Sequence, residues 1–364
     1  MSTLKVDDIQ SRQSTDDAIS LASDSSVSLK HSASAKLTTT STGVTVTGTC
    51  TATAFSGDGS ALTGLSSGLS SDAQRNVVGG TDAGVSFSGT SAQDNTLIGH
   101  NAGNAITTGD GNICVGAFAG FKSTTAISNV FVGRYAGQEN ISGNYNIGIG
   151  VSSLLRITSG ANNVAIGREC AEDLTTADNN VFIGGYAGSV MTTGSASVFI
   201  GYEAGKASTT QVNQVHIGYK AGLNMNGSHG NVLIGADVAR NQTTGGNNVA
   251  IGPDALLGAS GGSAGNRNTA VGYQCGININ NSSTGDNTFL GARCGYNVTS
   301  GTNNLCLGYQ AGQSSSPSGT ITTGSNNVVL GNNSITNIYC ADTTISSSDQ
   351  RDKTDITSFN LGLA

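Results

Sequence analysis

Histidine, serine and acidic residues are the first candidates for chemistry in this chain, because hydrolases combine a nucleophile, a base and a carboxylate. The four histidines are scattered and form no motif with a serine and an aspartate. We therefore expect no hydrolytic triad. The histidines are His31, His100, His216 and His229. In the repeat described below, His100 follows a glycine and His216 occupies a variable position, so both are expected at the surface.

Acidic residues on neighbouring segments form a second candidate site. Cleavage of a glycan needs two carboxyl groups about 5–10 Å apart in a groove. Glu169, Glu172, Asp173 and Glu203 could supply such a pair. Because acidic residues are mostly exposed and solvated, we expect no enzyme, and a glycan-cleaving depolymerase is kept as the alternative.

Seven cysteines could form disulfides or bind zinc, but the chain contains no CxxC pair. Five of them occupy repeat columns that otherwise hold alanine or other apolar residues, which predicts small buried side chains. Two GDG segments, 57–59 and 109–111, lack the full calcium motif and predict tight turns. We expect no metal and no cofactor. The five cysteines are Cys170, Cys275 and Cys294 in one column, and Cys114 and Cys306 in another.

The composition argues against a thick globular core. Among 364 residues there are 53 glycines, no tryptophan and only 11% charged residues. The net charge of −7 is too small, and Val, Ile and Thr are too regular, for a typical disordered chain. The chain has no basic stripe, so we expect no binding to nucleic acid. The start MSTLKVDDIQ has no apolar leader and no long apolar run follows, so we expect synthesis in the cytoplasm and no membrane insertion.

An internal repeat organises most of the chain. A glycine closing the motif NxxIG recurs every seventeen residues from Gly99 to Gly252, with slightly longer steps before and after. We call it the marker glycine and number positions relative to it. The markers are Gly80, Gly99, Gly116, Gly133, Gly150, Gly167, Gly184, Gly201, Gly218, Gly235, Gly252, Gly272, Gly291, Gly308 and Gly331.

Each marker follows a short alternating segment typical of a β-strand. Positions −3 and −1 are mostly aliphatic, whereas position −2 varies, so we predict that −1 forms the buried core and −2 faces solvent. Position −4 is usually Asn, which can hydrogen-bond to neighbouring coils. A second strand is expected to end near the Thr-Thr pairs, such as 175/176 and 192/193. The predicted core residues are Ile166, Ile183, Ile200, Ile217, Ile234 and Ile251.

A unit this short cannot bury its apolar face alone, so the units must stack. The absence of helical periodicity predicts an all-β fold, a parallel β-roll or β-solenoid of about fifteen coils. At about 4.8 Å per coil this is a rod of roughly 67 Å. A regular array of threonines also leaves an ice-binding solenoid as an alternative of another class.

The repeat resembles the head repeats of trimeric autotransporter adhesins, whose signature is close to the NNVAIG found at 162–167 and 247–252. That resemblance covers about 250 residues and implies a parallel β-roll in an intertwined homotrimer. A trimeric adhesin head is therefore a further alternative.

Both ends resemble parts of tailed-bacteriophage fibres. TCTATAFSGDGSALTGL at 49–65 is similar to a fibre collar segment. SSDQRDKTDI at 347–356 resembles the opening of the endosialidase-type intramolecular chaperone, which implies Ser348 as nucleophile, Lys353 as its base and Asp349 as the new N-terminus after self-cleavage. Few residues follow this motif, so we expect a vestigial site and an intact chain.

The sequence thus predicts three regions and a structural function. Residues 1–75 form an attachment and collar segment, 76–335 the repeat region, and 336–364 a linker with the start of a truncated chaperone. We expect a homotrimeric bacteriophage fibre, assembled in the host cytoplasm and carried on the virion. Its partners are tail or capsid proteins and a host receptor, either a glycan or an outer-membrane component. Avidity would supply the binding strength.

Overall fold

The computed structural model describes residues 8–10, 17–21, 26–31, 34–41, 43–49 and 70–337. The chain divides into two compact units, Met1–Leu65 and Ser66–Ala364. In the described residues all regular structure is β, and no helix is present that could cross a membrane.

The first unit contains a five-stranded antiparallel sheet in the order β1-β2-β3-β4-β5. Its strands alternate polar and apolar residues, as in VSLKH and SAKLTTT, which suits a sheet with two different faces. The strands are β1 (Asp8–Gln10), β2 (Asp17–Leu21), β3 (Val27–His31), β4 (Ser34–Thr40) and β5 (Gly43–Val46).

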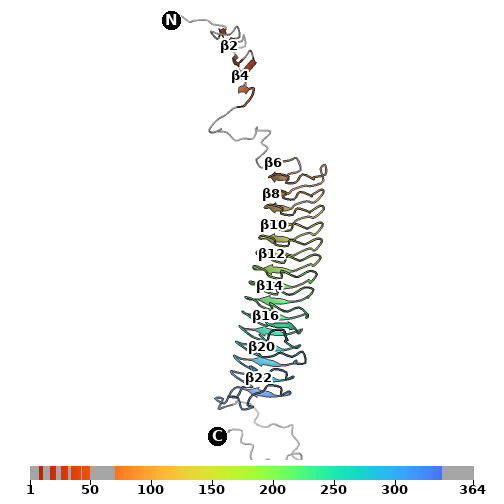
Figure 1. Ribbon diagram of the computed structural model, residues 1–364, viewed down its shortest axis with the longest axis vertical. Coiled ribbons are helices and arrows are strands. Elements are labelled where there is room, and N and C mark those ends of the chain that lie inside the picture. Colours follow the sequence, from red (N-terminus) through yellow and green to blue (C-terminus); the bar gives the residue numbers. More distant parts are fainter. Residues whose placement is uncertain are drawn as a thin grey trace, which may run out of the picture. The chain divides into compact units, whose positions relative to one another are not determined.

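The second unit is a β-solenoid, which confirms the predicted fold class. One short strand per coil joins a single 16-stranded sheet, parallel throughout except where β6 meets β7. Figure 1 shows these strands stacked one above another, with the rest of each coil looping to one side. The first strands are β6 (Ser70–Ser71), β7 (Val77–Gly79), β8 (Thr96–Ile98), β9 (Ile113–Val115), β10 (Val130–Val132), β11 (Ile147–Ile149), β12 (Val164–Ile166) and β13 (Val181–Ile183).

The register of this sheet follows the repeat, so that Val181, Phe182 and Ile183 pair with Val198, Phe199 and Ile200. Each column of the repeat therefore becomes a continuous ladder along the stack. The remaining strands are β14 (Val198–Ile200), β15 (Val215–Ile217), β16 (Val232–Ile234), β18 (Val249–Ile251), β20 (Thr269–Val271), β21 (Thr288–Leu290), β22 (Leu305–Leu307) and β23 (Val328–Leu330).

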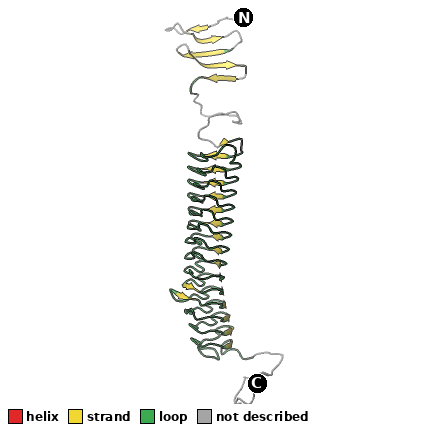
Figure 2. Cartoon of the chain, turned by 90° about the vertical axis from the view of Figure 1, so that its right-hand side faces the viewer, coloured by secondary structure: helices red, strands yellow, loops and turns green. Residues whose placement is uncertain are grey.

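The second strand predicted near each Thr-Thr pair is absent from most of the described coils. The exception is a separate pair, β17 (Gln242–Thr244) and β19 (Gly262–Ser263), which stands outside the main column of strands in Figure 2. Elsewhere the threonines link coils individually. The amide of Thr175 donates to the carbonyl of Thr192, and the Thr175 hydroxyl donates to the same oxygen at 3.0 Å. This hydrogen bonding gives the threonine column a structural role.

The core lies on the opposite side of each strand from the one we predicted. Phe182 at position −2 is fully buried, whereas Ile183 at −1 remains 36% exposed. The same holds for the other members of the predicted core: Ile166 and Ile251 are also exposed, and Ile200, Ile217 and Ile234 are half-buried. Within one chain, the aliphatic column is an outer face.

The interior explains why position −2 varies so much. A seventeen-residue coil encloses a narrow space, and one strand position must fill it together with columns +3 and +7, such as Ala187 and Met191. In several coils a large residue at −2 is accompanied by a glycine at +4, and a small one by a large residue at +4. Where position −2 is Phe182, position +4 is Gly188, and a Cβ on Gly188 would lie 2.6 Å from the Phe182 ring. Where −2 is only Gly148, position +4 is the buried Leu154.

The marker glycine is required by two independent constraints. Gly184 has φ of +128°, in the region that side chains rarely adopt. A Cβ there would also lie 2.5 Å from the carbonyl oxygen of Gly201 in the next coil. Its neighbour Gly185 has neither constraint, because the nearest atom to a Cβ lies at 3.5 Å.

Candidate functional site

The most extensive candidate surface is the outer face of the solenoid sheet. In every strand of this sheet from β9 to β18, positions −3 and −1 are both Val or Ile. These side chains are half-buried or exposed, and no charged residue interrupts them. We call this surface the aliphatic face. Because uncharged apolar ladders of this length are unusual at a free surface, it is a candidate for contact with another macromolecule.

A buried amide ladder holds the aliphatic face flat and in register. Asn180 at position −4 donates from Nδ2 to Oδ1 of Asn163 at 3.0 Å and to the carbonyl of Gly194 at 2.9 Å. Its own Oδ1 accepts from the amide of Ser197 at 3.0 Å. The predicted hydrogen bonding between coils is confirmed. Each asparagine thereby fixes the start of a strand relative to the coils on both sides.

Aromatic and charged side chains gather beyond the marker glycines of the middle coils. The rings of Tyr202 and Tyr219 stack with centroids 5.8 Å apart at 12°, and both are close to half exposed. Lys206 lies 5.0 Å from the ring centroid of Tyr186 and 2.7 Å from a carboxylate oxygen of Glu203. The charges on this edge are therefore largely paired with each other.

Three of the four predicted carboxylates are paired with basic side chains. Glu203 is bound by Lys206 and lies 3.6 Å from Lys220, and its hydrogen bond to Lys206 is the main cause of its lowered pKa. Asp173 pairs with Arg156 at 3.1 Å, and Glu169 lies 3.8 Å from Arg168.

Burial and then the nearby charge of Glu169 raise the pKa of Glu172. The two grooves described next include none of the four.

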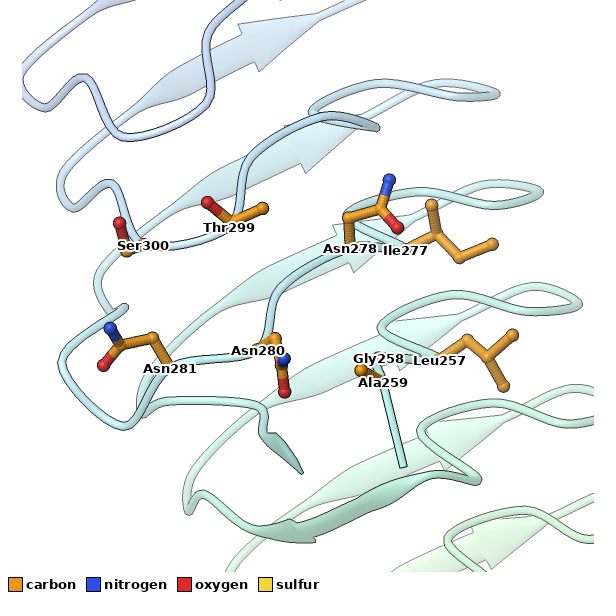
Figure 3. Close-up of a pocket in the computed structure, with 9 residues that line it drawn as sticks. All are labelled: Leu257, Gly258, Ala259, Ile277, Asn278, Asn280, Asn281, Thr299 and Ser300. Carbon is orange, nitrogen blue, oxygen red and sulfur yellow. The ribbon is translucent and has the colours of Figure 1, made fainter. Parts of the chain in front are cut away.

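Two grooves form where the repeat departs from its seventeen-residue period. The larger, of 480 Å³, is lined by nine uncharged residues from three successive coils: Leu257, Gly258, Ala259, Ile277, Asn278, Asn280, Asn281, Thr299 and Ser300. Figure 3 shows Leu257 and Ile277 side by side at one end, and Asn280, Asn281 and Ser300 at the other. A second groove of 390 Å³ lies beside β17 and β19 and includes His229 and Asn247. Neither includes a residue of the aliphatic face.

His216 is buried, so the expectation of a surface position is wrong. Its ring stacks on Phe199 at 4.7 Å, and Nε2 lies 3.1 Å from Oε1 of Gln214, while Nδ1 has no partner. Burial lowers its pKa to about 3. His100 is exposed as expected, and His229 accepts a hydrogen bond from the amide of Val212.

The five repeat cysteines are buried and free, as their columns predicted. Burial raises the pKa of the Cys114 thiol to about 12, which keeps it protonated and unreactive. Among the described residues no group of His, Cys, Asp and Glu side chains could hold a metal ion. Asp110, in the second GDG segment, accepts a hydrogen bond from the amide of Gln93 at 2.8 Å and so links two neighbouring coils.

The segments that resemble fibre proteins fall largely outside the described residues. Ser348, Asp349 and Lys353 belong to 338–364, and most of the collar-like segment belongs to 50–69. No protein-family model, curated protein or solved structure matches the chain.

Sequence reasoning missed two features of these surfaces. The inward direction of position −2 leaves only a partial trace in the sequence, an exchange of volume with +4 in some coils, as in the pairs Phe182/Gly188 and Gly148/Leu154. The larger groove could have been suspected from the longer steps after Gly252 and Gly272. Its shape, however, depends on how two inserted loops fold against each other.

Proposed function

We propose that this protein is a homotrimeric, non-enzymatic fibre of a bacteriophage virion, in which the solenoid is a stiff shaft that presents its outer edges to a host surface. The observation that carries the proposal is the aliphatic face, which a lone chain leaves in contact with water.

The aliphatic face is large enough to be a contact between proteins. A strip three residues wide and nine coils long covers roughly 10 by 43 Å, or about 430 Å². This is about half of the roughly 800 Å² per partner of a standard interface. It is also as large as the largest apolar patch on a typical monomer, which is often functional.

Other copies of this chain are the partners that fit the face best. A second copy has the same coil spacing, so ridges of Val and Ile on one chain meet equally spaced ridges on another. In a trimer around a common axis, the −3 column of one chain would face one neighbour and the −1 column the other. The net charge of −7 per chain resides outside this strip and does not oppose the contact.

The fibre assignment depends further on the resemblance of residues 49–65 and 347–356 to phage fibre segments. In this proposal the N-terminal region attaches the shaft to tail or capsid proteins. The exposed edges of three parallel solenoids offer each binding surface in several copies, so that weak contacts with host glycans or outer-membrane components add up.

Mass photometry of the full chain tests the assembly. We expect trimers, and we expect them to persist in 1 M NaCl because the contact is apolar. The double variant Ile183→Lys/Ile200→Lys should give folded monomers. The matched control Thr193→Lys/Thr210→Lys adds the same charges to exposed positions of the same coils and should leave the trimer intact.

A stable wild-type monomer would refute the trimeric shaft. The virion assignment has a separate test, which is electron microscopy of purified particles from cells that express the protein. Rods bound by an antibody to the solenoid are expected on tail or capsid, and particles without the protein would contradict the assignment.

A further inference from the structure

We propose that the groove between the inserted loops of residues 257–300 binds a neutral saccharide. This inference rests on the proposed function in one respect: it names a ligand class for the host-binding role proposed above.

The groove exists because two consecutive coils are longer than the rest. The step from Gly252 to Gly272 is twenty residues and the next step is nineteen, so extra residues must bulge outward. Backbone hydrogen bonds fix the loops: Gly258 donates to the carbonyl of Ile277 at 2.8 Å, and Asn280 donates to that of Thr299 at 3.2 Å. The hollow is therefore held by the backbone before any ligand arrives.

The lining excludes ionic ligands by its chemistry. All nine residues are uncharged, and their polar atoms are amides and hydroxyls. A phosphate, carboxylate or ammonium group would lose its hydration there without gaining a counter-charge. A neutral ligand rich in hydroxyl groups would exchange water for equivalent hydrogen bonds.

Apolar and polar surfaces are arranged as a sugar ring requires. Leu257 and Ile277 occupy the same repeat position, +5, on adjacent coils and form an aliphatic strip for the C–H face of a pyranose (Figure 3). Within the described part of the chain, the side-chain carboxamide of Asn280 and the hydroxyl of Ser300 have no hydrogen-bond partner. They can therefore donate to and accept from ring hydroxyls.

The remaining amides are oriented by the fold. Asn281 Oδ1 accepts from the amide of Ser283 at 2.8 Å, which leaves its NH₂ group for a ligand. Asn278 Nδ2 donates to the carbonyl of Tyr296 at 2.7 Å, which leaves its oxygen as an acceptor. The volume of 480 Å³ lies within the range of about 300–1,000 Å³ common for small-ligand sites.

The test uses the full chain in its native assembly. Binding is measured by saturation-transfer NMR with lactose and maltose, and on an array that displays neutral and anionic glycans. We expect binding of neutral saccharides at millimolar ligand, and array signals that do not depend on negative charge.

Two groove variants have matched controls elsewhere on the solenoid. Ile277→Ser and Asn280→Ala should each weaken binding about tenfold, the effect of one apolar contact or one hydrogen bond in a small site. The control Leu223→Ser removes an aliphatic side chain at +5, the repeat position of Ile277, in a coil without this groove, and Asn224→Ala removes an asparagine at +6 of the same coil, two positions before that of Asn280. They should bind like the wild type.

Binding that is unchanged in both groove variants would overturn the inference, as would retention of anionic glycans alone or of no neutral glycan. Mass photometry on the same samples keeps this result separate from the proposed function. Trimers that bind no neutral saccharide would refute the groove and leave the shaft standing. Monomers that bind a neutral saccharide would refute the trimeric shaft and leave the groove standing.

Discussion

Asn180 shows how much of the stack depends on single polar side chains. It is fully buried and its carboxamide hydrogen-bonds with groups of Asn163, Gly194 and Ser197, which lie on the coils before and after its own. Removing the carboxamide leaves several buried donors and acceptors unpaired at once, and each unpaired group costs about 1–3 kcal/mol.

We therefore expect Asn180→Ala to destabilise the solenoid by about 3 kcal/mol or more, measured by urea unfolding. Asn180→Ser should be milder, because Ser197 already occupies this column and its Oγ accepts from the amide of Gln214 at 3.3 Å. Equal stability of wild type and Asn180→Ala would contradict a structural role for the ladder.

His216 makes the stability of the stack depend on pH. Its folded pKa of about 3 lies below the pKa of 6.5 of an unfolded histidine, so between these pH values the unfolded chain binds a proton at His216 and the folded chain does not. The resulting stability is complete above pH 6.5 and declines between 6.5 and 3, by about 1.4 kcal/mol per pH unit within that window.

His216→Phe should remove this part of the pH dependence, because Phe131, Phe182, Phe199 and Phe289 already fill the same column. The measurement is the difference in urea midpoint between variant and wild type at several pH values. Other titrating groups cancel in that difference. A difference that stays constant from pH 7 to pH 4 would contradict the buried neutral histidine.

At the scale of the coil, the marker glycine sets how closely neighbours approach. Gly184→Ala should be severely destabilising, by about 3 kcal/mol or more, because both its φ and its 2.5 Å distance to Gly201 oppose a methyl group. Gly185→Ala is the matched control, since a Cβ there meets only ordinary contacts. Thermal unfolding of the two variants should differ clearly, and similar melting temperatures would show that the coils can separate at little cost.

The strand has two apolar sides with different tasks, and adjacent residues can separate them. Phe182→Ser should cost about 3–5 kcal/mol, because it empties a fully buried site and leaves a hydroxyl there. Ile183→Ser should lower the urea midpoint of an isolated chain less, because its side chain is already 36% exposed. If both substitutions cost the same in a monomeric background, the assignment of the two sides would be wrong.

Over the whole solenoid, the apolar core is divided into two clusters. One runs from Ala83 to Ala204 and the other from Ala221 to Val329. Between them lies a polar layer that includes Gln214 and His216. Stacked repeats behave as units coupled to their neighbours, so a weak layer can separate two cooperative blocks.

We expect amide hydrogen exchange, followed by mass spectrometry, to show lower protection in residues 205–222 than in 164–200. The double variant Gln214→Asn/His216→Phe restores the residues that other coils carry at these positions and should even out the protection. Uniform protection of the wild type along the stack would show that the polar layer couples the blocks as well as an apolar one.

The sequence by itself determined the period, the strand at each NxxIG motif, the amide ladder and the burial of cysteines that replace alanine. These follow from local spacing, because residues seventeen apart must occupy equivalent places in stacked coils. It did not determine which side of the strand faces inward, since Val181 and Ile183 are as apolar as Phe182. That choice was made by closure of the coil around a space that only one strand position, with its partner at +4, can fill. The larger groove likewise depends on tertiary structure, because the inserted residues show that a loop must bulge but not how Leu257, Ile277 and Asn280 come to line one hollow.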